Sequence, residues 1–169
     1  MNASLLRTGG EIAEIYMKHV DTVYRVALTL MKNIPEAEDA TQAVFIKFMT
    51  AEKSFDSDEH IKAWLIVTTR NVCLDLLRSW WRTRRVDIES VTEQEDRTEF
   101  PDNEVWQAIS NLDEKHKLPL YLHYYEGYKT EEIAGMLGIN HATIRTRLRA
   151  AKKKLRLILE KEEDDYANK

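Results

Sequence analysis

Residues 130–156, TEEIAGMLGINHATIRTRLRAAKKKLR, are the stretch that decides the fold. Thr130 is a good N-cap for a first helix, and Gly138 stands where a helix is usually closed by a left-handed residue. Asn140 offers a second N-cap, so a longer helix is predicted to start at His141. Two helices joined by a short turn that contains glycine are the sequence form of a helix-turn-helix.

The second of these helices has two distinct faces. Its apolar side chains form one stripe, made of Ile144, Leu148, Ala151, Leu155 and Ile158. Its other face is basic and contains Arg145, Thr146, Arg149, Lys152, Lys153 and Arg156. A helix that buries one stripe and presents a basic face suits the major groove of DNA. Basic runs are more often an ordinary solvated face, but the capped turn in front of this one favours DNA recognition.

Composition predicts an all-α protein without a membrane span. The 169 residues suffice for one domain or two small ones, and 43% of them are hydrophobic. Only five glycines and three prolines occur, and no hairpin dipeptide is flanked by alternating residues, which argues against strands. No apolar run approaches the roughly 20 residues that a membrane helix needs. The single cysteine, Cys73, excludes an internal disulfide and fits a reducing cytosol, so we expect a cytoplasmic protein.

The net charge of −4 is unevenly distributed along the chain. Residues 86–103 contain seven acidic side chains and one basic side chain, with little periodicity, which is typical of a linker. The sequence therefore predicts two small helical domains joined by an acidic linker, the C-terminal domain being a helix-turn-helix. The expected boundaries are 10–85 for the first domain, 86–102 for the linker, 103–160 for the second domain and 161–169 for an acidic tail.

Apolar periodicity predicts three helices in the first domain, over about 11–32, 35–51 and 58–85. Residues 1–10 are expected to be loose, and residues 52–58 to form a polar loop with one exposed aromatic, Phe55. In the second domain, one helix is expected from residue 102 or 103. Another is expected near Pro119, with Leu118, Leu122 and Tyr125 on its apolar side, ending at Gly127.

The end of the third helix, LLRSWWRTRR at 76–85, mixes four arginines with two adjacent tryptophans. Aromatic rings among arginines form a surface for stacking on bases and pairing with phosphates. Alternatively, one tryptophan packs inward and the arginines solvate the helix end, where cations are favoured. The sequence leaves these two interpretations open.

The sequence contains no pattern of an active site. The five histidines lack metal-ligand spacing, and neither a phosphate-binding glycine loop nor a nucleophile motif occurs. We therefore expect no metal, no cofactor and no catalysis.

Three segments together resemble the extracytoplasmic-function sigma factors, the minimal members of the sigma-70-type bacterial initiation factors. EAEDATQAVFIKFM (36–49) is similar to their core-binding segment, and AWLIVTTRNVCLDLLRSWWRTRR (63–85) to their helix that reads and melts the −10 element. LDEKHKLPLYLHYYEGYKTEEIAGMLGINHATIRTRLRAAKKKL (112–155) resembles their −35-reading domain. The resemblance covers about residues 10–160. It implies an alternative sigma factor that binds core RNA polymerase, recognises the −35 and −10 promoter elements and promotes DNA melting.

The resemblance also assigns roles to individual residues. The segment that docks on the clamp helices of the polymerase's largest subunit contains Asp39, Gln42, Phe45 and Phe48. The loop that captures a base flipped from the −10 strand contains Lys53, Phe55 and Ser57. The helix that contacts −10 DNA contains Arg70, Asn71, Asp75 and Arg78, and its end would hold phosphates through Arg82, Arg84 and Arg85. The −35 contacts are assigned to Thr143, Arg145, Thr146, Arg149 and Lys153.

The partners implied are core polymerase, through its clamp helices and its flap, promoter DNA and an anti-sigma factor. A freestanding DNA-binding regulator shares the helix-turn-helix, but it usually carries a βα domain that residues 11–85 do not suggest. A helical enzyme or structural bundle with incidental basic patches is the remaining alternative.

Overall fold

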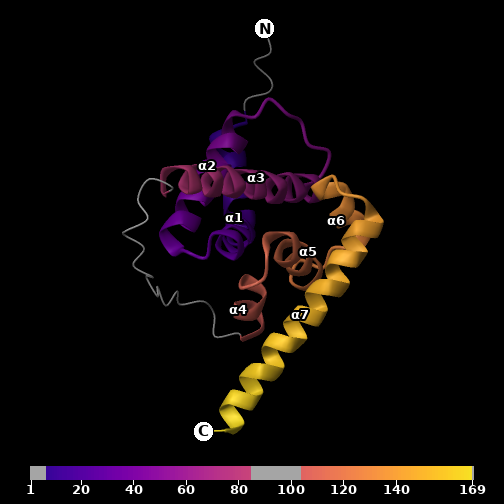
Figure 1. Ribbon diagram of the computed structural model, residues 1–169. Helices are drawn as coiled ribbons and strands as arrows, with labels where there is room; N and C mark the ends of the chain where they lie inside the picture. The colour runs from indigo at the N-terminus through magenta and orange to yellow at the C-terminus, as the bar shows by residue number, and fades with distance from the viewer. Residues whose placement is uncertain (1–6, 85–103, 169) are drawn as a thin grey trace. The chain divides into compact units, whose positions relative to one another are not determined.

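The computed structural model describes residues 7–84 and 104–168 (Figure 1). This part of the chain consists of seven helices and contains no strand, so the prediction of an all-α protein is confirmed. The helices fall into two compact units, three helices in the first and four in the second. The predicted linker at 86–102 lies outside the described residues.

The N-terminal unit contains α1 (Gly9–Met31), α2 (Ile34–Thr50) and α3 (Asp58–Arg84). Each of these helices packs against the other two around one apolar core (Figure 1). Its buried side chains include Val23, Val26, Ala27, Val44, Phe48, Leu65, Ile66 and Cys73. The prediction of three helices is thus confirmed, and the lone cysteine is a core residue.

Local capping explains where these helices begin. Thr8 and Glu11 form a reciprocal capping box at α1: the Thr8 hydroxyl accepts from the Glu11 N–H (3.2 Å), and the Glu11 carboxylate accepts from the Thr8 N–H (2.8 Å). The helix consequently starts two residues earlier than predicted and includes both glycines of a segment expected to be loose. Asn33 caps α2, and the Ser57 hydroxyl accepts from the His60 N–H (3.1 Å) at the start of α3.

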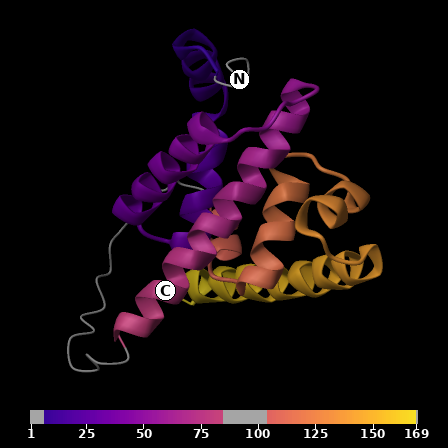
Figure 2. The same cartoon turned by 90° about the horizontal axis from the view of Figure 1, so that it is seen from above.

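The C-terminal unit contains α4 (Glu104–Ser110), α5 (Glu114–Tyr124), α6 (Thr130–Leu137) and α7 (His141–Ala167). The long α7 packs against each of the other three (Figure 2). The helix expected near Pro119 is α5, which begins at Glu114, continues through the proline and ends at Tyr124 rather than at Gly127. All residues from His116 to Leu122 are buried. Burial over two turns therefore stabilises a helix that lacks one backbone hydrogen bond.

The helix-turn-helix is present, with one correction to its first cap. Lys129 and not Thr130 precedes α6, and its N–H donates to the Glu132 carboxylate (2.7 Å). Gly138 closes α6 with a left-handed φ of 63°, and the Asn140 side chain caps α7, both as predicted. Residues 161–167, expected as a separate acidic tail, continue α7 to Ala167.

No helix within 7–84 or 104–168 is both long enough and apolar enough to cross a membrane.

Candidate functional site

The helix-turn-helix presents the basic face of α7 on a rigid support. Ile144, Leu148 and Leu155 are buried against the neighbouring helices, as the apolar stripe predicted. The Thr130 hydroxyl lies 2.8 Å from His141 Nε2 and ties the start of α6 to the start of α7. Packing and this contact together fix the angle between the two helices.

All five side chains expected to contact −35 DNA are exposed on α7, namely Thr143, Arg145, Thr146, Arg149 and Lys153. The Thr146 hydroxyl donates to the Ala142 carbonyl oxygen (3.0 Å). This bond uses its hydrogen and leaves its lone pairs and methyl group for a ligand. The first turn of α7 contains no acidic side chain. This face of α7 therefore presents several exposed, positively charged side chains and few groups that would repel a phosphate.

The loop between α2 and α3 is built around Phe55, which the sequence suggested to be exposed. The ring is instead half-buried. Its centroid lies 5.9 Å from that of Phe48, 5.7 Å from that of Trp64 and 5.2 Å from that of His60. Such ring clusters are stabilised by edge-to-face contacts as well as by area burial. The loop therefore has an ordered aromatic floor, although its backbone is neither helix nor strand.

The other two loop candidates have different surroundings. Lys53 is exposed, and its Nζ lies 5.7 Å from the Phe55 ring centroid. Ser57 is exposed too, but its hydroxyl oxygen already accepts the hydrogen bond that caps α3. The structure thus brings Lys53 and Phe55 together and gives Ser57 a local role in ending the loop.

Asp58 anchors the far end of the loop to α1. The Lys18 ammonium lies 2.9 Å from Oδ2 of Asp58, and His19 Nε2 lies 3.0 Å from Oδ1. The hydrogen bond from Lys18, and after it the one from His19, holds the pKa of the Asp58 carboxyl below its usual value. The carboxylate also sits in the first turn of α3, where the helix dipole favours it.

Three of the α3 candidates share one exposed face. Asn71, Asp75 and Arg78 follow each other at helical spacing and are all exposed, whereas Arg70 is half-buried. An ion pair joins Arg78 Nη1 to Asp75 Oδ1 at 3.5 Å. Because both partners are well exposed, this pair adds little to stability and leaves Arg78 available.

The end of α3 extends this face. Arg82 is exposed, while the Arg84 side chain and Arg85 lie outside the described residues. Trp80 is half-buried, and Trp81 is 65% exposed with its ring edge-on to that of Trp80 at 5.2 Å. One tryptophan thus packs partly inward, and the other offers a face to a ligand.

The four candidates on α2 divide between surface and core. Asp39 and Gln42 are exposed. Phe45 is only 5% exposed, and Phe48 is fully buried. The expectation that both phenylalanines contact a partner is therefore corrected for Phe48, whose ring supports the loop through Phe55 and Trp64. Phe45 instead contacts Tyr16 of α1, with ring centroids 4.8 Å apart.

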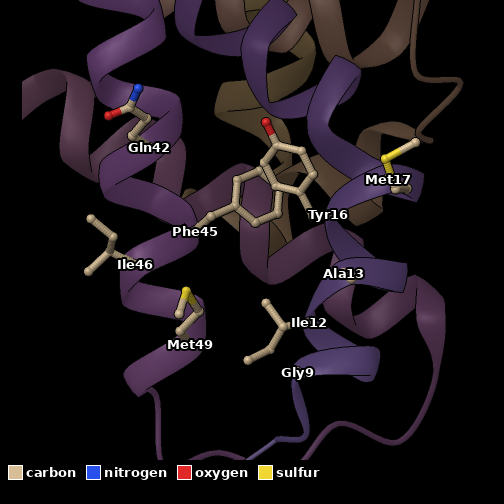
Figure 3. A pocket seen from close by; sticks show the side chains of 9 residues that line it. All are labelled: Gly9, Ile12, Ala13, Tyr16, Met17, Gln42, Phe45, Ile46 and Met49. Carbon is tan, nitrogen blue, oxygen red and sulfur yellow. The ribbon is translucent and has the colours of Figure 1, made fainter.

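An apolar groove of about 450 Å³ runs between α1 and α2 beside these residues. Figure 3 shows the Tyr16 and Phe45 rings meeting across it, with Ile12 and Met49 facing each other further along. Ile46, Met17 and Met49 are 60%, 77% and 46% exposed. Contiguous exposed apolar side chains mark protein-binding surfaces, and methionines adapt to a partner's shape. Sequence reasoning identified the helix but missed these three side chains.

The described residues contain no group of three side chains placed to hold a metal ion. The buried His116 has one other metal-binding type of side chain beside it, since its Nδ1 lies 3.7 Å from the Asp113 carboxylate. Burial, and after it the charge of Lys154, lowers the pKa of His116.

Two family models match the chain. Sigma-70 region 2 matches residues 15–83, and Sigma-70, region 4 matches residues 102–155. The first match covers nearly all of α1, α2 and α3, and the second covers α4, α5, α6 and the first half of α7. The two matched regions together make up more than two thirds of the chain.

Curated relatives and a solved structure agree with these matches. The chain is 29% identical over 147 residues to the RNA polymerase sigma factor SigV of Bacillus subtilis, covering 86% of this chain and 89% of that protein. It is also 29% identical over 157 residues to the ECF RNA polymerase sigma factor SigL of Mycobacterium tuberculosis, covering 86% and 87%. Its fold is similar to the sigma factor RpoE crystallised with the anti-sigma factor NepR from Bartonella quintana. That match has a TM-score of 0.73 and 22% identity, covering 89% of this chain and 97% of that one.

Proposed function

The chain belongs to the sigma-70 family of RNA polymerase sigma factors, in its extracytoplasmic-function group, and from this we propose which surface performs each step of initiation. It is an alternative sigma factor that directs core RNA polymerase to promoters. One observation carries this conclusion: region 2 and region 4 occur in the family's order, one on each compact unit. The resemblance stated from the sequence is thereby confirmed.

The exposed face of α7 is our proposed reader of the −35 element. Arg145 and Arg149 lie one helical turn apart on this face and have the planar donors that recognise guanine edges or phosphates. Thr143 and Thr146 are small enough to let the helix approach the bases, and Lys153 reaches toward the backbone. Support comes from the exposure of all five side chains and from the buried stripe that fixes the helix.

The −10 element is assigned to the α2–α3 loop and to the exposed face of α3. In this proposal a base flips out of the −10 strand and stacks near Phe55, with Lys53 close to its phosphate. Flipping costs a few kcal/mol, which stacking and a fitted pocket offset. Asn71, Asp75, Arg78 and Arg82 then follow the strand along α3, with Trp81 available to stack on a further base. Arg70, Arg84 and Arg85 remain candidates for phosphate contacts.

Core polymerase binds, in this proposal, along the α1–α2 groove. Asp39 and Gln42 give the polar rim, and Ile46 and Met49 give the apolar centre, which matches the usual anatomy of a protein interface. The clamp helices of the largest subunit are the partner here, and the flap binds the C-terminal unit. An anti-sigma factor that covered the same groove would keep the protein inactive.

We expect the polymerase to supply all the chemistry of RNA synthesis, so no catalysis is assigned to this chain. The site of action is then the cytoplasm, where polymerase and promoters meet.

Transcription by purified bacterial core polymerase from a promoter library, with and without this protein, tests the proposal. Transcripts that depend on the protein, and whose promoters share two elements at a fixed spacing, are expected. Arg149→Ala should reduce the yield of these transcripts without reducing core binding, because the side chain is assigned to DNA alone. Duplex DNA binding by the protein without any response of the polymerase would instead identify a freestanding regulator.

A further inference from the structure

A side chain from outside the α2–α3 loop holds the loop in place. The Arg7 guanidinium donates from Nη1 to the carbonyl oxygens of Phe48 (2.8 Å) and Ala51 (3.0 Å). It also donates from Nη2 to the carbonyl oxygen of Lys53 (2.6 Å). These acceptors lie more than forty residues further along the chain, in the last turn of α2 and the first half of the loop. Arg7 therefore joins the residue before the cap of α1 to the loop assigned to the −10 strand.

The end of α2 explains why such a partner is needed. The last four carbonyl groups of a helix have no N–H donor within the helix. α1 and α6 close with left-handed residues, Lys32 and Gly138. α2 does not, because Ala51 is extended with φ −71° and ψ 120°. Arg7 supplies a donor to one of these carbonyls, that of Phe48, and another to the carbonyl of Ala51, the C-cap residue. Its positive charge is also favoured by the negative end of the α2 dipole.

The same guanidinium contacts the aromatic floor of the loop. Its Cζ lies 4.3 Å from the ring centroid of Phe48 and 5.0 Å from that of Phe55. Phe48 is fully buried and cannot move without disturbing the core. Arg7 therefore links the loop ring, Phe55, to a fixed ring through cation–π contacts and to three carbonyls through hydrogen bonds.

Arginine suits this position better than lysine does. Its planar fork has five N–H donors in fixed directions and stacks on aromatic rings, whereas an ammonium is a compact point charge. The neighbouring capping box between Thr8 and Glu11 fixes the direction in which the chain enters α1. The backbone next to Arg7 is thus fixed as well as its guanidinium.

We propose that Arg7 is a positioning residue for promoter opening, which fixes Lys53 and Phe55 in the arrangement that receives the flipped −10 base. This inference rests on the proposed role of the loop in capturing that base. A loop that is ordered before DNA arrives does not lose conformational freedom when the base binds. The contribution of Arg7 should consequently appear in opening and in single-strand binding, and not in binding to core polymerase.

The test uses the full chain with core polymerase and a promoter chosen from the library. Opening is followed by the fluorescence of a 2-aminopurine in the −10 element, and a single-stranded oligonucleotide of the same element measures strand affinity. Arg7→Gln should slow opening and weaken strand binding by about tenfold, the value of one charge-assisted hydrogen bond. Arg7→Lys should restore part of the loss because it keeps the charge. Arg25→Gln, at an exposed arginine on α1, is the matched control and should have no effect.

A double-mutant cycle with Phe55→Ala separates positioning from a general loss of stability. If Arg7 acts through the loop, the double variant should open no more slowly than Phe55→Ala alone. Normal opening by Arg7→Gln, with slow opening by Phe55→Ala, would refute the role of Arg7 and leave that of the loop intact. Normal opening by Phe55→Ala would remove the loop assignment and this inference with it. A loss of core binding by Arg7→Gln equal to its loss of opening would show a purely structural role.

Discussion

Replacing Ile46 by aspartate should abolish most of the affinity for core polymerase while leaving the fold intact. Ile46 is 60% exposed at the α1–α2 groove. Burying a whole isoleucine side chain is worth about 1.5–3 kcal/mol, so covering the exposed part contributes about 1–2 kcal/mol. Ile46→Ala should therefore weaken binding about 5- to 30-fold. A carboxylate in the same contact adds a desolvation cost, so Ile46→Asp should weaken it at least about 100-fold.

Fluorescence anisotropy of the labelled protein, titrated with core polymerase, measures this affinity. Ile46→Leu keeps the apolar surface and is the matched control, expected to bind within about threefold of the original chain. Thermal unfolding should be almost unchanged in all three variants because the side chain is already exposed. Phe48→Ala is the opposite case, since it removes a fully buried ring and should cost about 3–5 kcal/mol of stability. Tight core binding by a folded Ile46→Asp variant would show that the groove lies outside the interface.

Three further predictions concern the C-terminal unit. Gly138→Ala should lower the free energy of unfolding by about 1 kcal/mol, because φ is 63° there, and so lower the midpoint of thermal unfolding by about 4–8 °C. Gly135→Ala, in α6 with open space around it, should instead raise the free energy of unfolding by up to about 1 kcal/mol. Burial lowers the pKa of His116, so below about pH 6.5 the unfolded chain takes up a proton that the folded unit does not, and stability should fall as the pH drops from 6.5 toward the folded pKa. His116→Phe should flatten that part of a stability curve measured by thermal unfolding between pH 5 and 7, and an unchanged curve would contradict the assignment. Arg149→Ala should reduce the slope of log affinity against log salt for a −35 duplex by about 0.9, the value of one phosphate contact; an unchanged slope with lower affinity would indicate a base contact instead.

Local signals were sufficient to predict the helix-turn-helix. Gly138 and Asn140 act through their own backbone and nearest neighbours, so their roles follow from residue type and position. The cap of α6 was placed one residue too late, since the Lys129 N–H donates to the Glu132 carboxylate and the Thr130 hydroxyl lies against His141. The sequence located α5 near Pro119, and the burial of residues 116–122 explains why the helix continues on both sides of the proline.

The helices of the candidate site and their buried faces were predictable, but not every side chain that the site exposes. The apolar spacing of 36–49 predicted α2 and its inner side, and the five side chains expected there are buried, namely Ala37, Ala40, Val44, Phe45 and Phe48. The spacing did not identify the apolar side chains that stay exposed beside that face. In the structure Phe48 is buried while Ile46 and Met49 are exposed. Arg7 had no sequence signal at all, because each of its acceptors is a backbone carbonyl more than forty residues away.

The distribution of charged side chains along α7 is opposite to the one that the helix dipole favours. A helix dipole favours acids at the start and bases at the end, but the first turn of α7 has no acid and the last turn has no base. All of its arginines and lysines except Lys161 lie between Arg145 and Arg156, and all of its acids lie beyond Leu159. This order costs helix stability, so a function outside the helix must favour it, and contact with a phosphate backbone is such a function. Because α7 is continuous, Asp164 stands about 22 Å from Arg149 along the axis, well beyond the roughly 8 Å over which charges interact at physiological salt. The acidic end therefore lowers the net charge, and with it nonspecific attraction to DNA, without weakening the contacts that Arg149 makes.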